Sequence, residues 1–388
     1  MKLIKVFLAA LFFILIMAFP AWGLSDSTDD GHYAADAEGY FAEQAHESGA
    51  DSLYEKLPTE TQRLLNELGI ESIDFYSILD TSPHAVLDLL MGMLGGQMNA
   101  PLKTMLQLAG ILLLLAAAQS IVPPGEGLHE TIRMVGAALM LVSLIGPMSA
   151  IFSASAAAIG IGADFMLLLI PVYTGIIAAT GQPTLALSSG TLAFTAAEGL
   201  AQLSKTFVAP FCGMFAALGS VGSFVPELEL NSLTKMVRKL AIGATTAAAS
   251  LYAALLSLKG VLANAADSVG ARGIQLILKA AVPVVGGALS EAYTSIAGSL
   301  SLLKSAVGVF AIMAVLLINA PVLLQSLVWV SGLKLLAAAA GMLGMESISA
   351  LLDAIVSAVT LLAVLVLFGV VLLLLSAGVA LSVRQVPV

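Results

Sequence analysis

The chain has 388 residues, of which 59% are hydrophobic and only 11% charged, and its mean hydropathy is +1.00. This composition excludes a water-soluble domain as the main part of the chain, because such domains carry about a quarter charged residues. Residues 24–100 contain 15 acidic residues against Lys56 and Arg63, a net charge of −13, whereas residues 101–388 are nearly neutral. Nucleic acid is not an expected partner, since no basic stripe is present to neutralise phosphates.

Residues 1–23 contain the parts of a signal peptide in the usual order. Two lysines precede an apolar stretch over residues 6–19, and small residues stand at the −3 and −1 positions for cleavage after Gly23. An uncleaved anchor helix fits the same residues, although the apolar run is short for a spanning helix. Both interpretations place the following residues outside the cytoplasm.

Residues 24–100 are expected to form an acidic extracytoplasmic region, flexible at first and then helical. Residues 24–50 have few large aliphatic side chains, which predicts a flexible leader. The capping-box sequence of residues 59–62 predicts a helix that ends at Gly69. Ser82-Pro83 predicts the start of a second helix, which Gly95-Gly96 is expected to end.

Residues 101–388 are predicted to form an all-α, polytopic transmembrane helical bundle of seven to eight spans. A span needs about 20 apolar residues to cross a bilayer core of about 30 Å. Suitable segments lie at residues 102–122, 131–152, 161–180, 184–203, 206–225, 240–258, 307–330 and 355–382. Five crossings would bring the basic cluster Lys235, Arg238 and Lys239 to the cytoplasm, in agreement with the positive-inside rule, but merging the fourth and fifth segments would reverse this.

The small residues of this part predict close packing between helices in lipid. The chain has 35 glycines, and runs of small side chains such as Ser153–Gly162 allow helix backbones to approach one another. Prolines 147, 171, 210 and 321 lie inside predicted spans, where neighbouring helices must compensate for the missing N–H group.

The stretch from residue 259 to residue 304 is apolar but contains an unusual pattern of polar residues. Arg272 and Lys279 fall on one side of a predicted helix that ends at Pro283 and that could instead lie flat at the membrane interface. The next predicted helix carries a seam of small and polar residues at alternating spacings of four and three: Ser290, Thr294, Ala297, Ser301, Lys304 and Gly308. Two interpretations fit this seam, a water-exposed or pore-lining face and a close-packing contact between helices or subunits.

Acidic residues at membrane depth are functional candidates because burying their charge is costly. The candidates are Asp164, Glu198, Asp267, Glu291 and Asp353. Glu198 precedes Lys205 by seven residues, which fits an ion relay but also fits two residues near a span end. The sequence Gly160–Asp164 is similar to the GxGD signature of intramembrane aspartyl proteases, but it contains an extra alanine and lacks a convincing partner aspartate.

No catalytic residue, cofactor site or metal site is predicted. The four histidines lie outside the predicted spans, and the HExxH, GxSxG and P-loop motifs are absent from the sequence. Cys212 is the only cysteine and is interpreted as a packing residue.

The order of parts, a signal peptide, an acidic helical region and a polytopic body, resembles the stage III sporulation protein AE family of endospore-forming bacteria. The most specific stretches are residues 281–292, with sequence AVPVVGGALSEA, and residues 302–309, with sequence LLKSAVGV. The resemblance implies a subunit of the sporulation channel complex in the mother-cell membrane around the forespore. It also implies other stage III A proteins and the forespore stage II Q protein as partners, and a separate ATPase as the energy source.

The sequence thus predicts a non-enzymatic, multi-pass and oligomeric subunit of a trans-envelope channel or secretion complex, embedded in the lipid bilayer. Two alternatives remain open: a secondary transporter that works alone, and a membrane scaffold that does not conduct. The long, low-complexity leader is a departure from the family pattern.

Overall fold

The computed structural model describes residues 33–73, 77–78, 81–121, 127–180, 182–203 and 286–382, together with short stretches between residues 206 and 258. Every regular element among these residues is helical, which confirms the predicted all-α class. The elements are α2 (Tyr33–Ser48), η2 (Asp51–Leu53), α3 (Thr59–Glu67), α5 (Pro83–Gln97), α6 (Asn99–Ile121), α7 (Gly127–Ala179), α8 (Pro183–Leu203), α11 (Gly286–Met342) and α12 (Glu346–Ser382). The predicted signal peptide lies outside the described residues.

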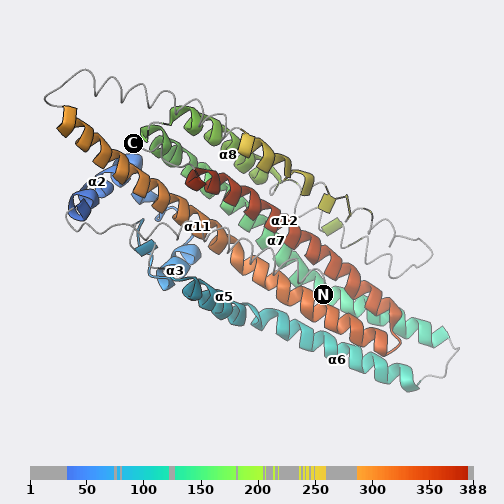
Figure 1. Cartoon of the computed structure of the whole chain (residues 1–388). Helices are drawn as coiled ribbons and strands as arrows, with labels where there is room; N and C mark the ends of the chain where they lie inside the picture. Colours follow the sequence, from blue (N-terminus) through green and yellow to red (C-terminus); the bar gives the residue numbers. More distant parts are fainter. Residues whose placement is uncertain are drawn as a thin grey trace.

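The long helices lie side by side in an elongated bundle with α11 at its centre (Figure 1). Helix α11 contacts α12 and α7 extensively, and it also contacts α6, α5, α3 and α2. The most apolar window of α11 is 89% buried, whereas the corresponding window of α6 is only 17% buried. Helix α11 is therefore the core of the bundle, and α6 is an outer helix.

Four of the described helices are long and apolar enough to cross a membrane. They are α6, the Thr131–Ala179 part of α7, the Leu302–Met342 part of α11 and the Glu346–Ala377 part of α12. The predicted spans at 102–122 and 355–382 correspond to α6 and α12, and the segment at 184–203 corresponds to α8, which is outside this group of four. The predicted span at 206–225 lies mostly outside the described residues, and 240–258 lies there in part.

The predicted break between the spans at 131–152 and 161–180 is wrong, because both segments belong to the continuous helix α7. The residues between them are mainly alanine, serine and isoleucine, which carry no turn signal, and alanine has the highest helix propensity. At 1.5 Å per residue the 53 residues of α7 form a rod about 80 Å long. A bilayer core is about 30 Å thick and helix tilts are usually below about 40°, so α7 extends well beyond one core.

Helix α11 likewise joins two predicted elements. The seam-bearing helix and the span at 307–330 form one helix of 57 residues that runs through Pro321. Pro147 and Pro171 also lie inside a continuous helix, α7. The seam and the buried core of the bundle therefore lie on the same rod.

The prediction of a flexible leader over residues 24–50 is wrong for residues 33–48, which form α2. Helix α2 has few large aliphatic residues, and small and aromatic side chains pack it against the rest of the protein instead. Ala45 is buried, and Phe41 packs against the hydrophobic core. The Ser299 hydroxyl of α11 donates a hydrogen bond to Gln44 Oε1 at 3.0 Å, which connects α2 to the central helix.

Helix α3 ends as predicted but begins differently. Gly69 adopts a positive φ of 80° and closes the C-terminus. The N-cap, however, is Pro58, and no side chain caps the helix. Gln62 Nε2 instead donates to the carbonyl oxygens of Glu55 and Leu57, at 3.1 and 2.9 Å, so the predicted capping box is wrong.

Helix α5 begins as predicted. Ser82 Oγ accepts a hydrogen bond from the Ala85 N–H at 3.2 Å, and Pro83 occupies the first turn. The helix does not end at Gly95-Gly96 but continues to Gln97, and α6 follows after one residue.

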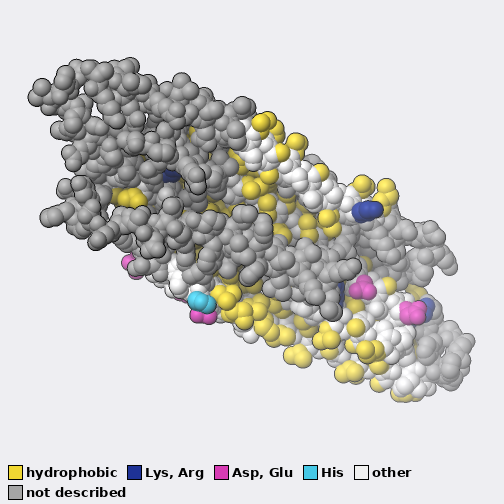
Figure 2. Space-filling view, in the orientation of Figure 1, with side chains coloured by type: hydrophobic (Ala, Val, Ile, Leu, Met, Phe, Trp, Pro, Cys, Tyr) yellow, Lys and Arg dark blue, Asp and Glu magenta, His cyan; other side chains and the backbone are white. Residues whose placement is uncertain are grey.

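The outer face of the bundle is apolar where α6 and the first half of α7 lie. Leu106, Leu113 and Leu114 of α6 and Val142 of α7 are all more than 60% exposed. Hydrophobic side chains gather along the edge of the molecule that contains α5 and α6 (Figure 2). An exposed apolar surface of this extent is suited to lipid and not to water.

A tight turn joins α11 to α12 and sets their antiparallel packing. Gly344 has a φ of 74°, its N–H donates to Gly341 O at 3.1 Å, and the Met345 N–H donates to Ala340 O at 2.9 Å. This pair of bonds is the Schellman motif, which requires a left-handed residue just after the helix.

Replacing Gly344 with Ala should lower the free energy of unfolding by about 1–2 kcal/mol, because a Cβ is strained in the left-handed conformation. Thermal unfolding of the detergent-solubilised protein measures the change. The matched control is Gly341→Ala, three residues earlier and inside α11, where an added Cβ makes only an ordinary contact with Ser349 Oγ at 3.7 Å. Equal stability of Gly344→Ala and Gly341→Ala would contradict the assignment of this turn.

Candidate functional site

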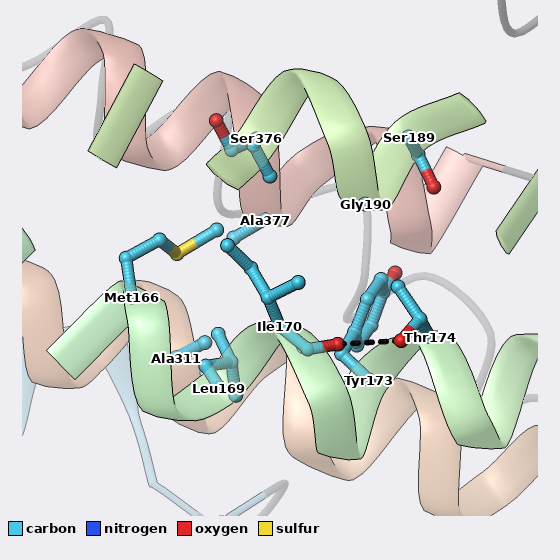
Figure 3. A pocket seen from close by; sticks show the side chains of 12 residues that line it. Met166, Leu169, Ile170, Tyr173, Thr174, Ser189, Gly190, Ala311, Ser376 and Ala377 are labelled. Carbon is cyan, nitrogen blue, oxygen red and sulfur yellow. Dashed lines mark hydrogen bonds between the residues drawn. The ribbon is translucent and has the colours of Figure 1, made fainter. Parts of the chain in front are cut away.

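Helices α7, α8, α11 and α12 meet around a small pocket, which is the strongest candidate site among the described residues (Figure 3). We call it the four-helix junction and define it by the residues Tyr173, Thr174, Ser189, Gly190, Gly308 and Ser376. Its remaining lining is apolar and includes Met166, Leu169 and Ala311. Among the described residues, those that line the pocket provide hydroxyl groups and no charged side chain.

The aliphatic hydroxyl groups at the junction donate to the backbone of their own helices. Thr174 Oγ1 donates to Ile170 O at 2.8 Å, Ser189 Oγ donates to Leu185 O at 2.6 Å, and Ser376 Oγ donates to Leu372 O at 2.8 Å. Such bonds to the carbonyl four residues earlier are the usual way for Ser and Thr to lie inside an apolar helix.

Two tyrosines approach the junction in different ways. Tyr252 lies on the short apolar helix Thr246–Leu258, and its hydroxyl shares a 2.5 Å hydrogen bond with Ser376 Oγ. The hydroxyl of Tyr173 is buried and has no hydrogen-bond partner in the described part of the chain. The Tyr173 ring rises from α7 toward the segment of α8 that carries Ser189 and Gly190 (Figure 3).

Glycines allow the backbones of this region to approach closely. A Cβ on Gly190 would lie 2.5 Å from Thr174 Cγ2, closer than carbon atoms can pack. A Cβ on Gly162 of α7 would lie 3.1 Å from Leu373 Cδ1 of α12 and 3.4 Å from Asn319 Nδ2 of α11. The expectation that the run Ser153–Gly162 supports close helix contact is confirmed at Gly162.

The predicted seam of α11 reaches this junction at its C-terminal end. Ser290, Thr294 and Ser301 belong to α11, but their side chains lie outside the described residues. Lys304 is only 6% exposed. Gly308, one turn further along, lines the junction.

The acidic candidates do not converge on one site among the described residues. Asp164 and Asp353 are exposed on α7 and α12. Glu198 is half-buried on α8, and its Oε1 accepts a hydrogen bond from Gln202 Nε2 at 3.0 Å.

The side chains of the other charged candidates lie outside the described residues. Glu291 belongs to α11, but its side chain is not described, and Arg272, Lys279, Asp267 and Lys205 lie outside the described residues. Within the described ranges, no three His, Cys, Asp or Glu side chains are grouped so that they could hold a metal ion.

Sequence reasoning missed most of the junction. Of its six residues, only Gly308 belonged to a predicted pattern, the seam. Tyr173 was detectable in principle, because it is a polar aromatic residue inside an otherwise apolar segment, and such residues usually need a hydrogen-bond partner. Ser189 and Ser376 carried no comparable signal, since serine is common in membrane helices.

An all-helical bundle with four candidate spans and an apolar outer face defines a polytopic helical membrane protein. The chain belongs to the stage III sporulation protein AE family, whose family model matches residues 75–383. The match includes helices α5 to α12 and confirms the resemblance inferred from the sequence.

A curated relative bears the same name, Stage III sporulation protein AE, and comes from Bacillus subtilis (strain 168). It is 24% identical over 157 residues, which are 40% of this chain and 39% of the relative. The aligned part therefore spans less than half of that protein's length. No solved structure matches the chain.

Replacing Gly190 with Ala should destabilise the protein by about 1–3 kcal/mol, since overpacking a close contact forces its neighbours apart. Thr174 is branched at Cβ and hydrogen-bonded to Ile170 O, so it cannot move away easily. The measurement is the unfolding midpoint in detergent. Gly199→Ala on the same helix is the control, because no atom lies within 4 Å of the added Cβ and alanine favours helix. Unchanged stability of Gly190→Ala would contradict the close contact of α7 with α8.

Proposed function

We propose that this chain is a non-enzymatic, multi-pass membrane subunit of a sporulation-associated channel or secretion complex between mother cell and forespore. The observation that carries the proposal is the family match over residues 75–383, on a chain whose helices are long and apolar enough to span a membrane. Sporulation and the membrane are the parts of this proposal with direct support, and the channel role extends them.

The burial of α11 favours a pathway between subunits over a pathway inside one chain. The central helix is enclosed by α12, α7, α6, α5, α3 and α2 of the same chain. Lys304, the charged member of the predicted seam, is buried among these helices. A wide aqueous pore would need a polar, open face on its lining helices. We therefore expect any conducting path to form where several copies or partner subunits meet.

The proposed orientation follows from the N-terminal sequence. Residues 1–23 direct export, residues 24–100 lie outside the cytoplasm, and residues 101–388 form the membrane domain. The net charge of −13 in residues 24–100 suits a region that remains in water and is not drawn to anionic lipid headgroups. The proposed partners are the other stage III A membrane proteins and, across the intermembrane space, the forespore stage II Q protein.

Replacing Ser290, Thr294 or Ser301 individually with Leu should disrupt assembly of the complex or passage through it, because a larger side chain separates surfaces that pack through small residues. Spore yield and co-purification of partner subunits measure the effect. Ser331→Leu is the matched control, since Ser331 lies on the same helix but is exposed. Normal sporulation and an intact complex in all three seam variants would contradict a role for the seam.

Cysteine labelling separates a wet channel from a dry scaffold and also determines the topology. Single cysteines at positions from 290 to 304, introduced after Cys212→Ser, would be treated with a membrane-impermeant thiol reagent in sporulating cells. Labelling along one face of the helix would show a wet path at the seam itself and would contradict the inference that any path lies between subunits. Complete protection of that face would favour the scaffold or a path lined by other surfaces. Solute transport by the purified protein alone in liposomes would favour the secondary transporter.

A further inference from the structure

The Tyr173 hydroxyl is a buried polar group without a protein partner in the described part of the chain. Tyr173 is 8% exposed, and its hydroxyl oxygen is fully buried. Leaving such a group unsatisfied destabilises the fold, and buried hydroxyl groups therefore nearly always have a hydrogen-bond partner. A phenylalanine would fill the same space without this cost, so the hydroxyl itself requires an explanation.

The surroundings of this hydroxyl are arranged to receive a hydrogen-bond donor. The hydroxyl hydrogens of Thr174 and Ser189 are used on the carbonyls of Ile170 and Leu185, which leaves lone pairs of both hydroxyl oxygens available. Ser376 Oγ instead donates to Leu372 O on its own helix and shares a 2.5 Å hydrogen bond with the Tyr252 hydroxyl, and it points away from Tyr173 (Figure 3). Helices α7 and α8 thus contribute hydroxyl oxygens to the pocket near Tyr173, and the Tyr173 hydroxyl can either donate or accept.

The pocket has room for about one water molecule. Its size excludes an organic solute, and a lining without charged side chains among the described residues disfavours a bound ion. Buried waters typically make about three hydrogen bonds to otherwise unsatisfied polar groups. The number and type of groups at the junction fit this requirement.

We propose that the four-helix junction holds one structural water molecule, which bridges the Tyr173 hydroxyl of α7 to the Ser189 hydroxyl oxygen of α8. The water accepts or donates a hydrogen bond at Tyr173 and donates to a serine oxygen, and it thereby replaces a direct contact between these helices. Gly190 and Gly308 line the pocket without adding a side chain to it. The inference stands apart from the sporulation role, because it concerns only how the helices are held together.

The test is the stability of the full-length Tyr173→Phe variant in detergent. If the water is present, removing the hydroxyl leaves the water and the Ser189 oxygen incompletely bonded, and the unfolding equilibrium constant should rise about tenfold. If the hydroxyl is unsatisfied, the same variant should be as stable as the parent protein or more stable, which would overturn the proposal. The sign of the change therefore decides between the two.

A double-mutant cycle with Ser189→Ala provides a second and independent measurement. A shared water couples the two side chains, so the combined variant should lose less stability than the two single variants together. Additive losses would overturn the bridge.

Comparing the stability of the protein in ammonium chloride and in sodium chloride at equal ionic strength tests the identity of the ligand. Equal stabilities are expected, and stabilisation by ammonium in the parent protein but not in Tyr173→Phe would overturn water in favour of a bound cation.

Discussion

The close packing of α7 and α12 against the central helix α11 is the contact on which the rest of the structure depends. In lipid the hydrophobic effect does not hold helices together, since the surrounding acyl chains are as apolar as the side chains. Close approach of the backbones, with the dispersion contacts that it permits, provides the attraction. Gly162 shows how this works, because α7 approaches both α11 and α12 at this one residue. The other described elements, including the N-terminal helices, pack around this centre.

The lengths of α7 and α11 set a second constraint. Helices of 53 and 57 residues cannot both remain inside one bilayer core, so the bundle contains parts in lipid and parts beyond it. Among the four candidate spans, α6 with 23 residues is the one whose length matches a single crossing. A subunit whose rods project from the membrane has surfaces that can meet partners in the intermembrane space, which is consistent with the proposed place in a trans-envelope complex.

Polar groups inside the bundle are arranged so that few of them need a partner on another helix. Ser155, Ser189 and Ser376 all donate to carbonyls on their own helices. Hydrogen bonds between helices include that of Tyr252 with Ser376 and that of Ser299 on α11 with Gln44 on α2. The Tyr173 hydroxyl has no hydrogen-bond partner in the described part of the chain.

The sequence by itself determined the helical class, the apolar body, the family and several local signals, such as the Ser82 N-cap and the Gly69 terminus. These features depend on composition or on contacts within a few residues, so no other part of the chain is needed to read them. Only the tertiary structure decided that residues 131–179 belong to one helix, that residues 33–48 form α2, and that Gly308 joins Tyr173 at one pocket. Each of these depends on residues far apart in the chain, because packing neighbours can stabilise a helix without strong local signals and can bring together side chains that no spacing pattern connects.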